Sequence, residues 1–278
     1  MTSNWRYSTQ LAPGERLAAL ALLNELDARL GREAIDENRR RLVQHNLPSH
    51  YWVHEQEGLL TGFAVEDLSA IPSVEMAGGA FDSSLAQQIA SRHSTFDWWI
   101  RNSQEAPKGL QVIRELRYME LDDLHVEQPQ RSIAIRSFVP GADDERWLEQ
   151  NNAAFAHHPE QGAWDIETLR TRSTEPWFDP SGFILFFEGD TLVASCWTKI
   201  HEFNTVRTGE IYVISVHPDH QGKGLGQFAL LNGLISIHSR GVHRASLYVD
   251  ASNQSAIAMY ESQGFKTVRT DQVVRLHL

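Results

Sequence analysis

The sequence predicts an α/β fold with two domains, each a mostly antiparallel mixed sheet flanked by helices. The chain has 278 residues, and one domain typically takes about 100 to 200. Strand-like runs alternate with stretches of helical spacing along both halves. A weak internal repeat also relates the halves, because residues 55–68 align with 187–200 and 109–121 with 264–278. Duplication of one mixed unit explains the repeat; chance similarity between hairpins is the alternative.

The first half opens with a helical region over residues 13–46. Its leucines recur at three- and four-residue steps and are expected to form one stripe that faces a core: Leu17, Leu20, Leu23, Leu26 and Leu30. The further elements expected are a hairpin over 51–68 around Gly58, a helix over 83–101 and a strand over 111–121. The polar stretch 122–132 has no periodicity and contains Pro129. We therefore expect domains at 1–125 and 132–278.

The second half repeats this order with clearer signals. A strand over 133–139 and a helix over 142–156 come first, followed by a hairpin whose arms are 183–187 and 192–200. A strand over 209–218 should end at Pro218, which cannot donate to a ladder. The remaining elements expected are a helix over 224–240, a strand over 245–251, a helix over 253–263 and two short strands within 265–278.

Composition and charge limit the kinds of partner. The chain has 25 basic and 36 acidic residues, so its net charge is −11, which disfavours binding to nucleic acid. No apolar run approaches the roughly 18 to 20 residues that span a bilayer, and the N-terminus lacks the basic start of a signal peptide. The single cysteine, Cys196, fits a reducing compartment. We expect a cytoplasmic monomer that acts on a small molecule, without membrane or nucleic acid.

A glycine-rich loop follows the strand over 209–218. In Gln221-Gly222-Lys223-Gly224-Leu225-Gly226, three glycines leave backbone N–H groups accessible, and the following helix directs its positive end at the same place. The spacing is neither that of a Walker loop nor that of a dinucleotide fingerprint. The pattern therefore predicts an anion site, and a simple glycine-rich helix entry is the alternative.

A second block downstream gives the loop a family context. Residues 245–265 predict a strand, then Asn253, a helix with Ala256 and Tyr260, and Gly264-Phe265. This pair of blocks resembles the GCN5-related N-acetyltransferases (GNAT) over about 132–278, with a degenerate copy in the first half. Four further blocks, over 151–164, 175–183, 197–201 and 209–216, look very like the mycothiol synthases, a family of tandem GNAT proteins. That resemblance implies acetyl transfer from acetyl-CoA to the cysteinyl amine of cysteinyl-glucosaminyl-inositol, the last step of mycothiol biosynthesis.

The resemblance implies a binding site for acetyl-CoA, the one co-substrate expected. The pyrophosphate should meet the N–H groups of the glycine loop, and the pantetheine arm should pair with residues 214–216 like an added strand. The residues expected to bind acetyl-CoA are Ile214, Ser215, Val216, Gln221, Gly222, Lys223, Gly224, Leu225, Gly226, Gln227, Asn253, Gln254, Ser255, Ala256, Ile257 and Ala258.

Two catalytic residues are implied in the same way. Glu210 is the candidate general base, through water; a cysteinyl α-amine has a pKa of about 7.7 to 8, so a distant carboxylate can suffice. Tyr260 is expected to donate to the departing thiolate. The alternative for Glu210 is an ordinary exposed strand residue, and the alternative for Tyr260 is an aromatic side chain packed on the helix face. The acceptor is expected to contact Glu160, Lys199, Glu210, Tyr248 and, from the first half, Glu37.

The first half departs from the family pattern where a phosphate loop should lie. Residues 76–89 contain Gly78 and Gly79 but no G-x-G at the helix entry, and Asp82 would repel phosphate. We therefore expect this half to be structural and acceptor-side, without acetyl-CoA. The histidines, including His217-x-x-His220, lack the helical spacing of a zinc site, so no metal ligand is expected.

Two other functions remain open from the sequence. The chain could acetylate another small amine, such as an aminoglycoside or a peptide N-terminus. Alternatively, it could bind acetyl-CoA as a sensor without catalysing transfer. Turnover on a panel of amines distinguishes the three.

Overall fold

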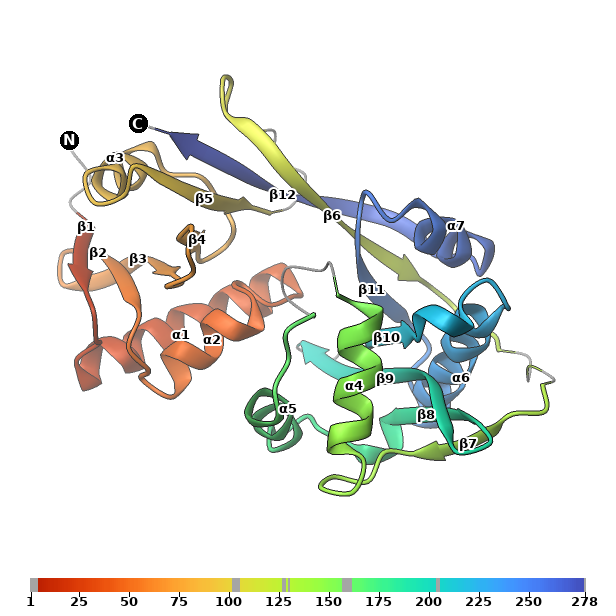
Figure 1. Cartoon of the computed structure of the whole chain (residues 1–278). Coiled ribbons are helices and arrows are strands. Elements are labelled where there is room, and N and C mark those ends of the chain that lie inside the picture. Colours follow the sequence, from red (N-terminus) through yellow and green to blue (C-terminus); the bar gives the residue numbers. More distant parts are fainter. Residues whose placement is uncertain are drawn as a thin grey trace. The chain divides into compact units, whose positions relative to one another are not determined.

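The computed structural model describes residues 5–101, 106–126, 129, 131–156, 162–203 and 206–277 (Figure 1). The chain divides into two compact units. The first comprises Met1–Tyr118, Asp250–Asn253 and Val268–Leu278, and the second Met119–Val249 and Gln254–Thr267. These units are not the contiguous ranges 1–125 and 132–278 expected from the sequence, because the end of the chain belongs with the first unit.

The first unit is built on a mixed sheet with the strand order β1-β2-β3-β4-β5-β12-β6. Its elements are β1 (Trp5–Ser8), α1 (Pro13–Leu30), α2 (Glu37–Gln44), β2 (His50–Gln56), β3 (Leu59–Glu66), β4 (Ser73–Met76), α3 (Ser83–Ala90), β5 (Thr95–Ile100) and most of β6 (Gln111–Leu121) and β12 (Lys266–His277). Strands β4 and β5 are parallel, whereas β12 pairs antiparallel with β5, Gln272 opposite Ile100. The last strand of the sequence therefore completes the sheet of the first unit.

Two separate cores cover the two faces of this sheet. On one face α1 and α2, which lie side by side, pack on Tyr51, Val53 and Phe63. On the other face α3 packs on Trp52 and neighbouring strands. Tyr51, Trp52 and Val53 are consecutive in β2, so the two-residue period of a strand sends them to alternate faces. The first unit is therefore a sheet between two helical layers.

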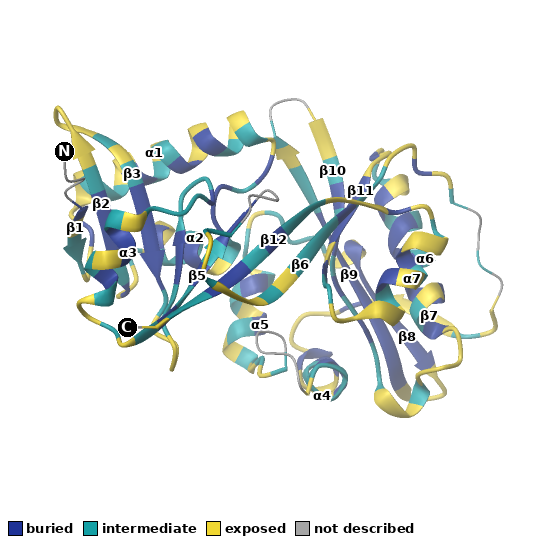
Figure 2. Cartoon of the chain, turned by 90° about the horizontal axis from the view of Figure 1, so that it is seen from above, coloured by how far each residue is buried: buried dark blue, intermediate teal, exposed yellow. Residues whose placement is uncertain are grey.

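The second unit has the same plan, with the strand order β11-β10-β9-β8-β7. Its elements are β7 (Ala134–Ser137), α4 (Asp144–Ala154), α5 (Ile166–Ser173), η1 (Pro180–Gly182), β8 (Phe183–Glu188), β9 (Thr191–Phe203), β10 (Val206–Val216), η2 (Pro218–His220), α6 (Leu225–Ser239), β11 (Ala245–Asp250) and α7 (Gln254–Ser262). One core contains α6 and α7, and the other Trp147 of α4 and Leu169 of α5. In Figure 2 the buried residues follow the strands of each unit.

The two units share the connectivity that the internal repeat indicated. In each, a two-residue turn joins a hairpin: Glu57-Gly58 joins β2 to β3, and Gly189-Asp190 joins β8 to β9. Gly58 and Gly189 both have positive φ, at 78° and 60°. Each hairpin also has a register shift, at His54/Glu55 and at Phe186/Phe187. A strand, a helix and a parallel strand follow both hairpins, so the repeat reflects two copies of one fold.

Three expectations about local structure were wrong. Residues 83–101 form α3 and then β5, because TFDWWI buries every second residue instead of following a helical period. Leu17 is 64% exposed, whereas Leu23 and Leu26 are buried, so the stripe on α1 is narrower than its leucines suggest. The C-terminal run is one strand, β12, since it pairs along six residues of β5.

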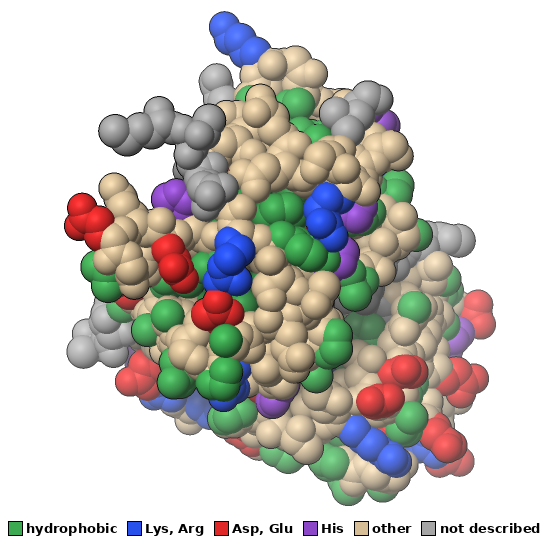
Figure 3. All heavy atoms as spheres, turned by 90° about the vertical axis from the view of Figure 1, so that its left-hand side faces the viewer, with side chains coloured by type: hydrophobic (Ala, Val, Ile, Leu, Met, Phe, Trp, Pro, Cys, Tyr) green, Lys and Arg blue, Asp and Glu red, His purple; other side chains and the backbone are tan. Residues whose placement is uncertain are grey.

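The surface carries both signs of charge. On the face of the described residues in Figure 3, acidic and basic side chains are scattered among hydrophobic ones. No described helix is both long and apolar enough to cross a membrane.

Candidate active site

The first feature of the candidate site is the point where β10 and β11 separate. These parallel strands pair at only three positions, from Gly209 opposite Ala245 to Ile211 opposite Leu247. Strand β10 continues to Val216 and remains paired with β9 throughout, after a register shift between Ile211 and Val213. The far end of β10 is therefore paired on one side, which leaves an open strand edge for an extended ligand.

The backbone of β10 presents alternate residues to this open edge. The N–H of His217 donates to the carbonyl of Val193 at 2.9 Å, so it points toward β9. Because backbone groups alternate along a strand, the N–H and C=O groups of Ile214 and Val216 point away from β9. The side chain of Ser215 lies on the α4 face, where its hydroxyl bonds Gln150 and Ser195, each at 3.0 Å.

The second feature is the N-terminus of α6. Its N-cap is Gly224, which adopts a left-handed conformation with φ of 74° and offers no side chain to the helix. Within the described part of the chain, the N–H groups of Leu225, Gly226 and Gln227 have no acceptor. Unpaired amides at a positive helix end form a binding site for an anion.

The loop before α6 is held from two sides. Arg131 donates to the carbonyl of Lys223 at 2.8 Å, and the Lys223 ammonium donates to the carbonyl of Asp219 at 3.3 Å. A Cβ on Gly226 would lie 3.3 Å from Met259 Sδ, so α6 and α7 approach closely at this glycine. The two sequence blocks that predicted a common site, the glycine loop and 253–263, therefore meet here.

Tyr260 lies on the buried face of α7. It is 5% exposed and packs near Phe265, and its hydroxyl has no hydrogen-bond partner among the described residues. Burial, with a smaller contribution from Cys196, raises the pKa of the Tyr260 phenol well above its usual value. The side chain therefore stays protonated near neutral pH and is available as a hydrogen-bond donor.

Glu210 faces a histidine that the sequence reasoning missed. The two side chains are diagonal neighbours across β9 and β10, because Glu210 is opposite Lys199 and His201 lies two residues farther along β9. His201 Nε2 and Glu210 Oε2 are 2.5 Å apart, and both side chains are 14% exposed. The sequence WTKIH contains His201, but only the strand register brings it to Glu210.

Lys199 lies on the same face, beside an aromatic wall. Lys199 is 4% exposed, and its ammonium lies 4.7 Å from the ring centre of Trp177 and 5.7 Å from that of Tyr212. Trp177 and Trp164 both pack against Trp197, with ring centres 5.8 Å and 6.2 Å from that of Trp197. The four blocks 151–164, 175–183, 197–201 and 209–216, separate in the sequence, therefore meet around Trp197.

The comparison with known proteins identifies the family. Residues 145–265 match the model of the acetyltransferase (GNAT) family. The mycothiol acetyltransferase of Streptomyces coelicolor is 36% identical over 96% of this chain and 93% of its own length. That of Thermobispora bispora is 32% identical over 97% of this chain and 99% of its own length. The chain belongs to the mycothiol acetyltransferase family. It is thus an acetyl-CoA-dependent acyltransferase of the GNAT superfamily.

Solved structures agree with the fold of a tandem GNAT protein. A GCN5-related N-acetyltransferase from Sphaerobacter thermophilus has a TM-score of 0.68 and 17% identity, covering 98% of this chain and 95% of its own. A tandem GNAT protein from the clavulanic acid pathway also has a TM-score of 0.68, with 16% identity over 99% and 98% of the two chains. The α/β fold with two GNAT-like copies is therefore confirmed.

The remaining site residues expected from the mycothiol acetyltransferase family lie in different settings. Tyr248 is 37% exposed on β11. Glu160 lies outside the described residues. Glu37 belongs to the first unit, half-buried in the first turn of α2. Their contacts with an acceptor remain predictions.

The residues expected to bind acetyl-CoA also differ in their solvent exposure. Leu225 and Ile257 have buried side chains that belong to the core, so only their backbone could reach a ligand. The exposed members are Gln221, Gly222, Lys223, Gly224, Gln227, Asn253, Gln254, Ser255 and Ala258. Ile214, Val216, Gly226 and Ala256 are half-buried.

Proposed function

We propose that this chain transfers the acetyl group of acetyl-CoA to the cysteinyl amine of cysteinyl-glucosaminyl-inositol, the last step of mycothiol biosynthesis. The observation that carries the proposal is the open edge of β10 running toward the uncapped N-terminus of α6. The family relationship over nearly the whole chain supports the acceptor.

In this proposal acetyl-CoA binds along β10. The pantetheine amides pair with the backbone of Ile214 and Val216, and the pyrophosphate accepts hydrogen bonds from the N–H groups of Leu225, Gly226 and Gln227. The chain has a net charge of −11, so an anionic co-substrate needs such a local site. Each charge at a helix terminus gains only about 0.3 to 1 kcal/mol, and several amides must therefore act together.

Glu210 removes the proton from the acceptor amine, directly or through a water molecule. Its contact with His201 supports this role, because an imidazole beside the carboxylate can orient it and share the proton it accepts. An α-amine with a pKa of about 7.7 to 8 is partly neutral near pH 7, which reduces the basicity required of the carboxylate.

The tetrahedral intermediate carries a negative oxygen, and the thiolate of CoA leaves as it collapses. The backbone N–H of Val216 is directed to the open edge and is the proposed donor to that oxygen. Tyr260 donates to the leaving sulfur. Because its pKa is raised, we propose a hydrogen bond that stabilises the thiolate, with its proton remaining mainly on the phenol.

The acceptor has hydroxyl groups that need directional partners. Lys199 can donate to them from its position against Trp177 and Tyr212, and the aromatic wall can contact the apolar face of a sugar ring. That the acceptor also contacts Tyr248, Glu160 and Glu37 is part of the proposal, and it rests on the family relationship alone. We further propose that the first unit binds no acetyl-CoA, since Asp82 already accepts the amides at the start of α3.

We also propose that the chain is a monomer and that it is cytoplasmic. The single cysteine, which is buried, fits a reducing compartment. Sedimentation of the purified chain with and without acetyl-CoA tests the monomer, and fractionation of cells tests the compartment.

Mass spectrometry of products tests the function. The purified chain is incubated with acetyl-CoA and cysteinyl-glucosaminyl-inositol, and in parallel with aminoglycosides and peptide N-termini. We expect many turnovers on the cysteinyl compound and none on the other amines. Turnover on another amine would refute the acceptor but keep acetyl transfer. Acetyl-CoA binding without any product would instead indicate a sensor.

A further inference from the structure

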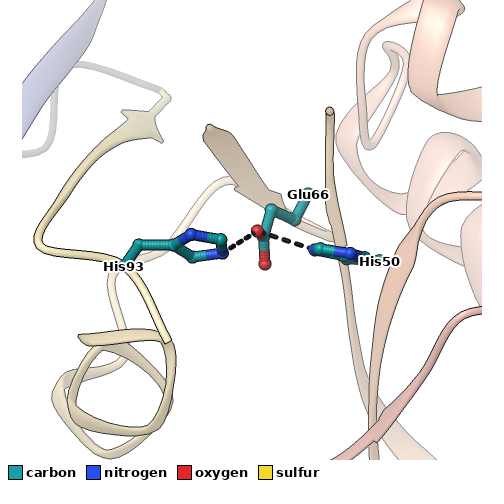
Figure 4. A group of neighbouring side chains, drawn as sticks. All are labelled: His50, Glu66 and His93. Atoms are coloured by element: carbon teal, nitrogen blue, oxygen red, sulfur yellow. Dashed lines mark hydrogen bonds and ion pairs between the residues drawn. The ribbon is translucent and has the colours of Figure 1, made fainter. Parts of the chain in front are cut away.

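Two histidines and a glutamate of the first unit converge outside the proposed active site. His50 begins β2, Glu66 ends β3, and His93 lies between α3 and β5 (Figure 4). His50 Nδ1 lies 2.9 Å from Glu66 Oε1, and His93 Nε2 lies 2.5 Å from the same oxygen. One nitrogen or oxygen from each residue lies within 4.8 Å of the others. No sequence spacing signals this group, which only the packing of α3 on the sheet assembles.

The group is held in place by its surroundings. Glu66 is fully buried, and its second oxygen, Oε2, accepts a hydrogen bond from Trp52 Nε1 at 3.2 Å. The two imidazole ring centres are 6.1 Å apart, with an interplanar angle of 24°. Each ring turns one nitrogen toward Glu66 (Figure 4). The side chains of His50 and His93 are 20% and 21% exposed, which gives an ion access from solvent.

The hydrogen bonding of the group is incomplete. His93 Nε2 is buried, and despite its short distance to Glu66 it has no partner with hydrogen-bond geometry in the described part of the chain. Glu66 Oε1 faces two ring nitrogens at once. An ion placed between the three side chains would satisfy both nitrogens and the oxygen together.

We propose that His50, Glu66 and His93 bind a divalent transition-metal ion, with zinc as the ion of best chemical fit. Two imidazole nitrogens and one carboxylate oxygen are a donor set that zinc takes, with bonds of about 2.0 to 2.2 Å. Donors on one tetrahedral zinc ion lie about 3.3 Å apart, so each of the two nitrogen–oxygen distances needs to lengthen by less than about 1 Å. Trp52 fixes the carboxylate as outer hydrogen bonds do at zinc sites.

The proposed ion has a structural role. His50 and Glu66 belong to neighbouring strands, whereas His93 follows α3, so the ion links the sheet to the helix layer of the first unit. Arg92 is a cation close to this group: its guanidinium lies 3.6 Å from the ring centre of Tyr7, a residue that also contacts His50. Its charge lowers the affinity for a cation without filling the site. The inference revises the sequence-based expectation that no residue binds metal.

Titration of the metal-free full-length chain with Zn²⁺ tests the site. Isothermal calorimetry at pH 7.5 is expected to give one tight site per chain, and Co²⁺ to give the visible absorption of a low-symmetry complex. His50→Ala and His93→Ala should each weaken binding at least tenfold, and Trp52→Phe should weaken it by about tenfold.

His54→Ala is the matched control, since His54 is on the same strand and its Nδ1 contacts Thr61 at 2.8 Å instead. This variant should bind Zn²⁺ as the unmodified chain does. Zinc should also raise the melting temperature of the unmodified chain and of His54→Ala, but not of His93→Ala. Zinc binding that survives both His50→Ala and His93→Ala would overturn the proposal, as would no binding by the unmodified chain at 100-fold excess of Zn²⁺.

Discussion

The N-termini of α3 and α6 occupy the same place in the two copies of the fold, yet they differ in whether their amides are already capped by a side chain. The N-cap of α3 is Asp82, whose carboxylate accepts the N–H of Ser84 at 2.8 Å and that of Leu85 at 2.9 Å. The N-cap of α6 is Gly224, which has no side chain to cap the helix. The first helix therefore holds its own anion, whereas the second leaves its amides available to a ligand.

The strands that lead to these helices differ in the same way. Glu75 of β4 is fully buried; it contacts Arg101 and lies 3.5 Å from Arg39, so arginines hold it in a fixed ionic network. Glu210 of β10 is partly accessible and faces the imidazole of His201. The glutamate of the first copy is thus held between two arginines, whereas the glutamate of the second copy faces an imidazole.

The largest effect is expected from Glu210→Gln. The amide keeps the shape of the side chain but cannot accept a proton, so kcat should fall by about 100-fold or more, most strongly at low pH, where less of the amine is neutral. Steady-state rates across pH 6 to 9 measure the effect. Glu202→Gln, an exposed carboxylate on β9, is the matched control and should leave the rate unchanged. A normal rate in Glu210→Gln would remove the carboxylate from the mechanism.

Gly224→Asp should convert α6 into a helix capped like α3. A carboxylate at this position competes with the pyrophosphate for the same amides and repels it, so the Kd for acetyl-CoA should rise by about 100-fold. Gly224→Asn separates charge from backbone strain, because asparagine has nearly the same shape, can cap the helix and tolerates positive φ. Calorimetry with CoA measures both. Equal losses in the two variants would mean that repulsion is not the cause.

Tyr260→Phe tests the donor to the leaving thiolate. Loss of one hydrogen bond to a charged sulfur should lower kcat by roughly 10- to 100-fold while the Kd for acetyl-CoA changes little.

The raised pKa of Tyr260 also makes the stability of the protein depend on pH. The phenol is favoured in its neutral form by folding, so its contribution is complete below pH 10 and is lost as the pH rises above that value. Stopped-flow product formation and urea unfolding from pH 8 to 11 measure the two effects. A large change in Kd would contradict a role confined to the leaving group.

Asp82→Ala should have the smallest effect, about 1 kcal/mol of lost stability from the missing helix cap. Burial alone would raise the pKa of Asp82, but hydrogen bonds from Ser84 and Leu85 outweigh it and lower the pKa. The stabilisation is therefore present above the usual pKa of 3.8 and is lost as the pH falls through the lowered value. Urea unfolding at pH 7 and pH 3 should show a smaller difference between the two proteins at pH 3 than at pH 7. The variant should still bind one acetyl-CoA per chain; a second bound molecule would show that Asp82 alone blocks the first copy.

Much of the candidate site could be predicted from the sequence because its signals are local. The glycine loop, the strand before it and the residues of α7 lie within short segments, where backbone freedom and periodicity act between near neighbours. The expected positions of α6, β10 and β11 therefore agree with the structure to within three residues. The two hairpins could be predicted equally well, since Gly58 and Gly189 mark turns that need positive φ.

What the sequence could not supply depends on pairing between distant segments. His201 becomes a partner of Glu210 only through the register of β9 on β10, and a shift of one residue would turn it to the other face. The group of His50, Glu66 and His93 likewise requires β2 and β3 to pair and α3 to pack on them.

The sequence by itself determined the family, the two copies of one α/β unit and the loop that can bind an anion, since each depends on a contiguous pattern. Only the tertiary structure decided that β12 completes the sheet of the first unit, that four separate blocks meet around Trp197, and that Asp82 caps α3 while the amides of α6 remain open. The physical reason is that strand pairing and side-chain packing depend on contacts between distant residues, which no local pattern encodes.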